Sequence, residues 1–377
     1  MRRFLILIVA LLAYGSLYPW NFVFTSAAGN PLLVLLHGWP SGWNRYVLRD
    51  AVLNVTIYVP LGLAAALVFR RKYPGPAAVA VATAFGFLFS VSMELLQVYV
   101  PGRDPSLSDV LTNTIGAAAG AAFAIYFEAR LRRLGERRAG QLRLASLLLL
   151  LVWFLYQLYP FFPAIGFRHL RQGLALLLHN RGVSVVETWA NCAEWFAVGL
   201  ALDTVFARMR TSWLAIAMLC VPAQLFVADR LVTVSEIAGS LAALALWHFV
   251  RPGSRPRCCA WMLGFAILLR QLQPFYFLAV PQPFSWVPFQ ATFMSNRLAA
   301  VVIIARKTFD YGATILALRC TGIPLVVAGL IVIAGLGVTE AVQTYLPGRS
   351  PEITDPLLAL MLMLVLWAVS RRVSKPE

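Results

Sequence analysis

Long apolar stretches alternate with short polar ones along almost the whole chain. About twelve of these stretches are long enough for a helix to cross a bilayer, which takes roughly 20 residues. Their ranges are 4–20, 50–69, 77–99, 107–127, 144–162, 185–206, 212–228, 231–250, 260–280, 298–318, 323–342 and 354–370. The stretch 31–39 is too short to span and predicts an interfacial or re-entrant segment. The pattern predicts an all-α, polytopic helical membrane protein.

Composition and charge place this protein in a membrane and exclude nucleic acid as a partner. Of 377 residues, 60% are hydrophobic and 13% are charged, which is too apolar for a soluble fold. The net charge of +16 comes from short basic clusters between apolar stretches, with no basic face. These clusters fall in every second loop, beginning at Arg2 and ending at Arg372. We therefore expect a multi-pass protein of the bacterial inner membrane with both termini in the cytoplasm.

A polar motif occurs twice with the same spacing and a third time in weaker form. The first copy is Glu94, Gln97, Arg103 and Asp109, and the last copy is Glu340, Gln343, Arg349 and Asp355. The middle copy keeps Gln224, Arg230 and Glu236 but has Val221 in place of the first glutamate. Fixed spacing of this kind indicates internal duplication. It predicts three parallel four-helix repeats, at 1–139, 140–256 and 257–377.

The first copy is predicted to form a polar cluster at the outer end of a helical hairpin. Its glutamate and glutamine lie three residues apart, so they share a helix face. A Pro-Gly pair then ends the helix, and Ser106 with Asp109 resembles a capping box that begins the next one. Asn113 follows one turn later, and Gly116 and Gly120 permit close packing of helices. We expect the cluster to face Asn54 of a neighbouring helix.

This cluster supports two interpretations. In the functional one, Arg103 binds an anionic group, Gln97 and Asn113 orient it, and Glu94 and Asp109 hold the arginine or exchange protons. In the structural one, the arginine pairs with the carboxylates and locks the hairpin. The structural interpretation is favoured for the two diverged copies. In the last group, Lys307 and Asp310 lie one turn apart and predict an ion pair within a span.

Cofactor and metal chemistry have no support in the sequence. The five cysteines include no Cys-x-x-Cys, and the four histidines are scattered. We therefore expect no cofactor and no metal site. The predicted outer face also offers no serine–histidine pair, and the chain has no nucleotide-binding motif, which disfavours an enzyme.

An ordered set of residues in the first 127 positions resembles the VanZ-like family. It runs from Asp50, Asn54, Pro60 and Gly62 through Glu94, Gln97, Arg103, Asp109 and Asn113 to Gly116. The resemblance covers about residues 15–127. It implies a small bacterial membrane protein of four or five helices, in a family named after a member linked to low-level teicoplanin resistance. It adds Asp50 to the candidate site and implies a role in the cell envelope, without supplying a reaction.

Three functional hypotheses follow. The first is a non-catalytic or transport protein whose outward pocket binds an anionic lipid headgroup, such as that of a polyprenyl-phosphate-linked envelope precursor. The second is a membrane enzyme acting on a lipid-linked phosphate or glycan, with Glu94 or Asp109 as the base. The third is a structural scaffold with no ligand. Membrane lipids are the expected partners, and the sequence assigns neither an oligomeric state nor a resistance role.

Overall fold

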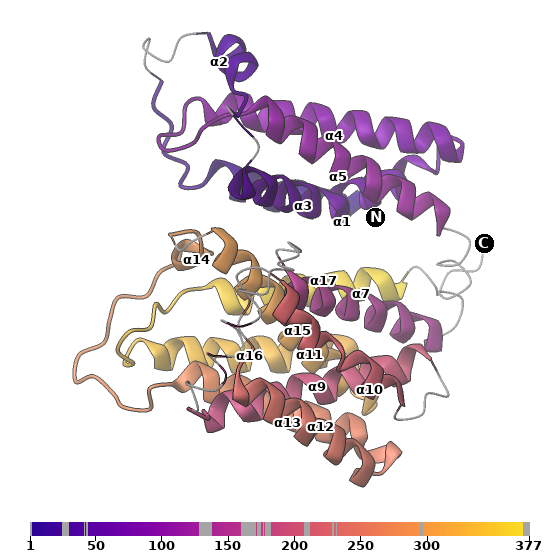
Figure 1. The fold of residues 1–377 in the computed structure, drawn as a ribbon, viewed down its shortest axis with the longest axis vertical. Helices are drawn as coiled ribbons and strands as arrows, with labels where there is room; N and C mark the ends of the chain where they lie inside the picture. The colour runs from indigo at the N-terminus through magenta and orange to yellow at the C-terminus, as the bar shows by residue number, and fades with distance from the viewer. Residues whose placement is uncertain are drawn as a thin grey trace. The chain divides into compact units, whose positions relative to one another are not determined.

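The computed structural model describes residues 2–24, 30–40, 42, 44–127, 138–159, 171, 175, 177, 182–206, 212–227, 230, 232–294 and 297–371. The chain divides into two compact units, Met1–Arg133 and Leu134–Glu377 (Figure 1). The described part is helical and contains no strand, and an isolated β-bridge joins Ser285 and Glu352. The all-α prediction is confirmed for these residues.

The first unit contains five described helices. They are α1 (Arg2–Leu17), α2 (Pro31–His37), α3 (Arg45–Phe69), α4 (Gly75–Gln97) and α5 (Leu107–Tyr126). Each long helix matches a predicted apolar stretch, and α2 occupies the short stretch at 31–39. Asn30 caps α2 and Ser106 caps α5, each through a side-chain oxygen that accepts a backbone N–H.

Glycines bring α3 and α5 into direct contact. A Cβ atom added to Gly116 would lie 2.2 Å from the carbonyl oxygen of Val55, and one added to Gly120 would lie 2.0 Å from that of Val59. From the other side, a Cβ on Gly62 would lie 1.8 Å from the carbonyl oxygen of Ala117. Only glycine allows backbones to approach this closely. The predicted role of Gly116 and Gly120 in close packing is confirmed.

The second unit is larger and has two central helices. Its helices are α7 (Arg138–Leu158), α9 (Val185–Val205), α10 (Ser212–Ala217), α11 (Cys220–Ala223), η2 (Gln224–Phe226), α12 (Val234–Phe249), η3 (Pro252–Ser254), α13 (Arg255–Leu272), α14 (Gln290–Met294), α15 (Arg297–Cys320), α16 (Leu325–Gln343) and α17 (Thr354–Arg371). Helix α9 packs against α7, α12 and α13, and α15 packs against α7, α13, α16 and α17. Each has a long buried segment, 192–201 in α9 and 309–317 in α15, with Trp195, Phe196 and Phe309 almost fully enclosed.

One predicted span is wrong as a continuous helix. The stretch 212–228 breaks into α10, α11 and η2. Pro222 lies in this break, and proline removes a backbone donor from a helix. The break places Gln224 in a short 3-10 turn, where its side chain is buried.

Three helices in the described part are long and apolar enough to cross a membrane. They are Tyr46–Phe69 and Gly75–Gln97 in the first unit and Leu325–Gln343 in the second. Shorter apolar helices accompany them, including Leu142–Leu158 and Val234–Phe249. Large aliphatic side chains remain exposed on α16, among them Leu330 and Val338, as expected of a helix that faces lipid. The total of twelve spans and their arrangement as three repeats stay predictions.

Candidate functional site

Arg103 of the first copy binds the end of α1. Its Nη2 atom donates to the carbonyl oxygens of Gly15 and Tyr18, each at 3.1 Å. Gln97 adds a third bond, from its Nε2 to the carbonyl oxygen of Ser16 at 3.0 Å. The last carbonyls of a helix have no partner within the helix, so these donors complete the C-terminus of α1. Arginine and glutamine therefore tie the α4–α5 hairpin to the first helix.

The other members of the first copy hold the turn between α4 and α5. Glu94 is buried, and its Oε2 accepts the backbone N–H of Ser106 at 3.0 Å. Asn113, also buried, donates to Ser90 at 2.9 Å. Neither Asn54 nor Asp50 forms a hydrogen bond or ion pair within the described residues, and the orientation of the cluster toward Asn54 stays a prediction. The side chain of Asn54 is only half-buried on α3.

Two substitutions of Glu94 distinguish the contribution of its charge to stability from the contribution of its hydrogen bond. We expect Glu94→Gln to retain most of the stability of the first unit, because an amide oxygen can still accept the N–H of Ser106. Glu94→Leu leaves that donor without an acceptor and is expected to cost about 1–3 kcal/mol. Thermal unfolding of the purified protein in detergent measures both. Equal loss in the two variants would show that the charge, and not the hydrogen bond, stabilises the turn.

The last copy repeats the contacts of the arginine and the first glutamate. Arg349 donates from Nη2 to the carbonyl oxygen of Arg270 at 2.5 Å and from Nε to that of Gln273 at 2.7 Å, at the end of α13. The Oε2 atom of Glu340 accepts the N–H of Glu352 at 3.0 Å, again twelve residues along the chain. The predicted pairing of Arg349 with the carboxylates is therefore wrong, because its nitrogens bind carbonyl oxygens. Burial lowers the pKa of the Arg349 guanidinium below its usual value, although the negative charge of Glu340 acts to raise it.

The turns that follow α1 and α13 also correspond. Trp20 and Phe275 both have a positive φ, of 64° and 66°. In the first unit, the segment after this turn then contacts the α4–α5 hairpin, where the N–H of Val23 donates to the carbonyl oxygen of Tyr99 at 2.8 Å. The equivalent bond in the second unit runs from Leu278 N–H to the carbonyl oxygen of Tyr345 at 2.7 Å. The two turns therefore have the same backbone conformation and the same hydrogen bond to the hairpin.

Asp355 of the last copy is fully buried among donors. Its oxygens accept from Lys307 Nζ at 2.6 Å, from the hydroxyl of Tyr311 at 2.7 Å and from Gln271 Nε2 at 2.5 Å. Gln343 in turn donates to Gln271. The predicted ion pair between Lys307 and Asp310 is wrong. Lys307 pairs with Asp355 on α17, and Asp310 pairs with Arg270 on α13.

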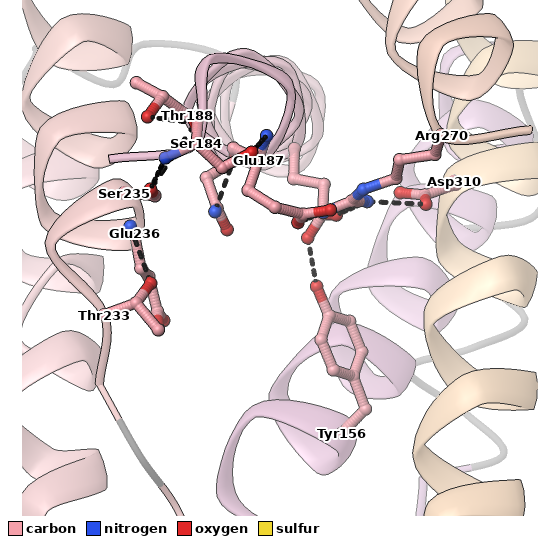
Figure 2. Close-up of polar contacts among 11 residues, drawn as sticks. Tyr156, Ser184, Glu187, Thr188, Thr233, Ser235, Glu236, Arg270 and Asp310 are labelled. Atoms are coloured by element: carbon pink, nitrogen blue, oxygen red, sulfur yellow. Dashed lines mark hydrogen bonds and ion pairs between the residues drawn. The ribbon is translucent and has the colours of Figure 1, made fainter. Parts of the chain in front are cut away.

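Arg270 is the centre of the largest ion-pair cluster in the described residues. It lies 3.0 Å from Glu187, 2.5 Å from Glu194 and 3.5 Å from Asp310 (Figure 2). The hydroxyl of Tyr156 donates to Glu194 at 2.5 Å from the end of α7. Helices α9, α13 and α15 thus meet at one guanidinium, and α7 joins the cluster through Glu194. Of these residues only Asp310 was expected from the sequence, although an arginine inside an apolar stretch was a visible signal.

The middle copy retains part of the motif. Gln224 donates from Nε2 to Glu236 at 2.6 Å, and Thr233 caps α12 by accepting the N–H of Glu236. Two guanidinium nitrogens of Arg230, Nε and Nη2, are buried without a hydrogen-bond acceptor in the described structure. Burial lowers the pKa of this arginine, Glu236 raises it, and the positive charge of Arg306 lowers it.

A cavity of about 340 Å³ opens beside the last copy. Its charged lining consists of four basic and four acidic side chains: Arg270, Arg306, Lys307, Arg349, Glu187, Asp310, Glu340 and Glu352. Three of the basic groups are engaged by carboxylates or carbonyls. Arg306 forms no hydrogen bond or ion pair within the described part of the chain. The volume suits a small polar group. The described residues contain no group of His, Cys, Asp and Glu that could hold a metal ion.

Residues 3–128 match the model of the VanZ/LLP1 family. The match confirms the resemblance found in the first group of helices and covers nearly the whole first unit. No curated protein and no solved structure matches the chain. Together with the apolar helices, the family match indicates a membrane protein.

Proposed function

We propose that this chain is an integral membrane protein of the cell envelope that binds the phosphate of a lipid headgroup, in a non-catalytic or transport role. The observation that supports it is Arg306, a cationic side chain on the lining of a cavity, with no hydrogen bond or ion pair in the described structure. Ionisable groups among apolar helices are costly and usually have a partner. A phosphate would supply the missing acceptor for this guanidinium.

A second arginine strengthens the proposal. Two guanidinium nitrogens of Arg230, which lies outside the lining of that cavity, are buried without acceptors. An anion would supply the acceptors that they lack. Arg103 was expected from the sequence to bind the anionic group. Because it donates to carbonyl oxygens at the end of α1, we favour a structural role for it. The proposed headgroup site is therefore in the second unit.

Lipids that purify with the protein test this proposal. We expect mass spectrometry to find a phosphate-bearing lipid enriched in the wild type and reduced at least about fivefold in Arg306→Gln and Arg230→Gln. Arg257→Gln is the matched control, because Arg257 is exposed at the far end of α13. The same unselective lipid in all four proteins, each folded, would contradict headgroup binding.

A purely structural role is the second candidate. Arg103 and Arg349 both complete the end of a helix, and Glu94 and Glu340 both hold a turn. These contacts explain the repeated motif without a ligand. They leave the cavity and Arg306 unexplained, and these two features favour the headgroup proposal for the second unit.

A further inference from the structure

We infer that the cavity of the second unit takes a zwitterionic ligand, in which a phosphate ester and an ammonium group are close together. The inference rests on the proposed function for the phosphate and adds the second charge. The residue that suggests an ammonium group is Asp310, which lines the same cavity as Arg306 but has the opposite charge. Headgroups of the aminoalkyl phosphate type have this chemistry, and so does a free aminoalkyl phosphate.

Asp310 has one oxygen that lacks a donor. The residue is only 7% exposed, and its Oδ2 lies 3.5 Å from Arg270, while its Oδ1 has no hydrogen-bond partner in the described structure. A buried carboxylate oxygen without a donor is unfavourable, because it has lost water and gained nothing in return. A donor from the ligand would satisfy it. An ammonium group is the strongest such donor, since the bond is assisted by charge.

The geometry of α15 brings Arg306 close to the unpaired oxygen of Asp310. Arg306 and Asp310 are four residues apart, so they share one face of the helix and are separated by about 6 Å along its axis. This spacing fits the phosphate and the amine of a single small headgroup. A ligand with only a phosphate would bind Arg306 but would leave the Oδ1 of Asp310 without a hydrogen-bond donor.

The charge balance of the cavity lining agrees with a zwitterion. Four basic and four acidic side chains line it, so the site as a whole has no excess of positive charge. A ligand of net negative charge would bring an unbalanced charge into this lining, whereas a zwitterion would not. The tyrosine and glutamine side chains on the lining, Tyr311 and Gln271, add neutral hydrogen-bonding groups.

Binding of two short-chain lipids to the full-length protein in detergent tests the inference. The probes are dihexanoyl phosphatidylethanolamine and dihexanoyl phosphatidic acid, and free phosphoethanolamine is the soluble probe. We expect the wild type to bind the ethanolamine lipid about tenfold more tightly than the acid. Arg306→Gln should weaken both lipids about tenfold. Asp310→Asn should remove the preference while retaining the binding of phosphatidic acid.

Matched variants at the opposite end of the unit control for unspecific effects of charge. Arg257→Gln removes one positive charge, as Arg306→Gln does. Asp203→Asn removes one negative charge, as Asp310→Asn does, from a residue that lies 3.8 Å from Arg255. Neither should change the preference. The melting temperature of every variant is measured, and Arg306→Lys provides a second variant that keeps the charge if Arg306→Gln does not fold.

The outcomes separate the inference from the function on which it rests. If the wild type binds both lipids equally and Asp310→Asn changes nothing, phosphate binding stands and the zwitterion is excluded. Binding of neither lipid nor of phosphoethanolamine overturns both proposals. Binding of free phosphoethanolamine as tightly as the lipid would keep the zwitterionic ligand and overturn its assignment to a lipid.

Discussion

Arg270→Met is expected to lower the free energy of unfolding of the second unit by about 3–5 kcal/mol, the usual effect of removing one partner from a buried ion pair. Met keeps an unbranched apolar side chain in place of the aliphatic stem of arginine and removes the charged guanidinium. Glu194 and Asp310 are buried, so their carboxylates would lose the only cation that contacts both within the described residues. Glu187 is 42% exposed at its side chain and would be largely hydrated, so it adds little to the loss.

Thermal unfolding in detergent, followed by circular dichroism, measures this effect. A loss of this size corresponds to a fall in melting temperature of roughly 10 °C for a unit of this length. Arg257→Met, at an exposed position on the same helix, should change it little. Adding Glu194→Gln to Arg270→Met should recover part of the loss, because one of the uncompensated charges is then gone. No recovery in the double variant would contradict the electrostatic explanation.

Gly62→Ala is expected to destabilise the first unit by about 2–4 kcal/mol, because the added methyl group has no space. Its Cβ would lie 1.8 Å from the carbonyl oxygen of Ala117, and that backbone cannot move without displacing α5. Helices α3 and α5 must then separate, which also loosens the contacts at Gly116 and Gly120. In most exposed helices the same change stabilises, since alanine is the better helix former.

The control for this variant is Gly335→Ala on α16. No atom lies within 4 Å of a Cβ built there, so the substitution should be neutral or slightly stabilising. Melting temperature and protease sensitivity of the purified protein report both changes. If Gly62→Ala were as stable as Gly335→Ala, the close contact between α3 and α5 would not exist in the folded protein.

The apolar pattern was sufficient to locate the helices. Every predicted stretch except 212–228 corresponds to a single helix in the residues that the structure describes, because burial and bilayer contact both favour long apolar helices. The exception contains Pro222, whose effect depends on whether neighbouring groups replace the lost hydrogen bond. The glycines at 116 and 120 were also identified correctly, because the spacing of small residues reports close packing directly.

Partners of charged side chains were not predictable in the same way. Lys307 and Asp310 lie one turn apart on α15, yet each pairs with another helix. Side chains within one turn are only candidates for contact, and a helix that packs closely on the same face offers better geometry. Arg103 and Arg349 of the repeated motif bind carbonyl oxygens at helix ends, which no sequence pattern marks.

The sequence by itself determined the helices, the repeated polar motif and the resemblance to the VanZ-like family, because all three depend on residues close together in the chain. Tertiary structure alone decided which carboxylates surround Arg270 and which groups line the cavity with Arg306 and Asp310. These residues come from α9, α13, α14, α15, α16 and the turn that follows α16, and over a hundred positions separate the first of them from the last. Contacts between helices depend on packing in three dimensions, and the chain does not encode that packing locally.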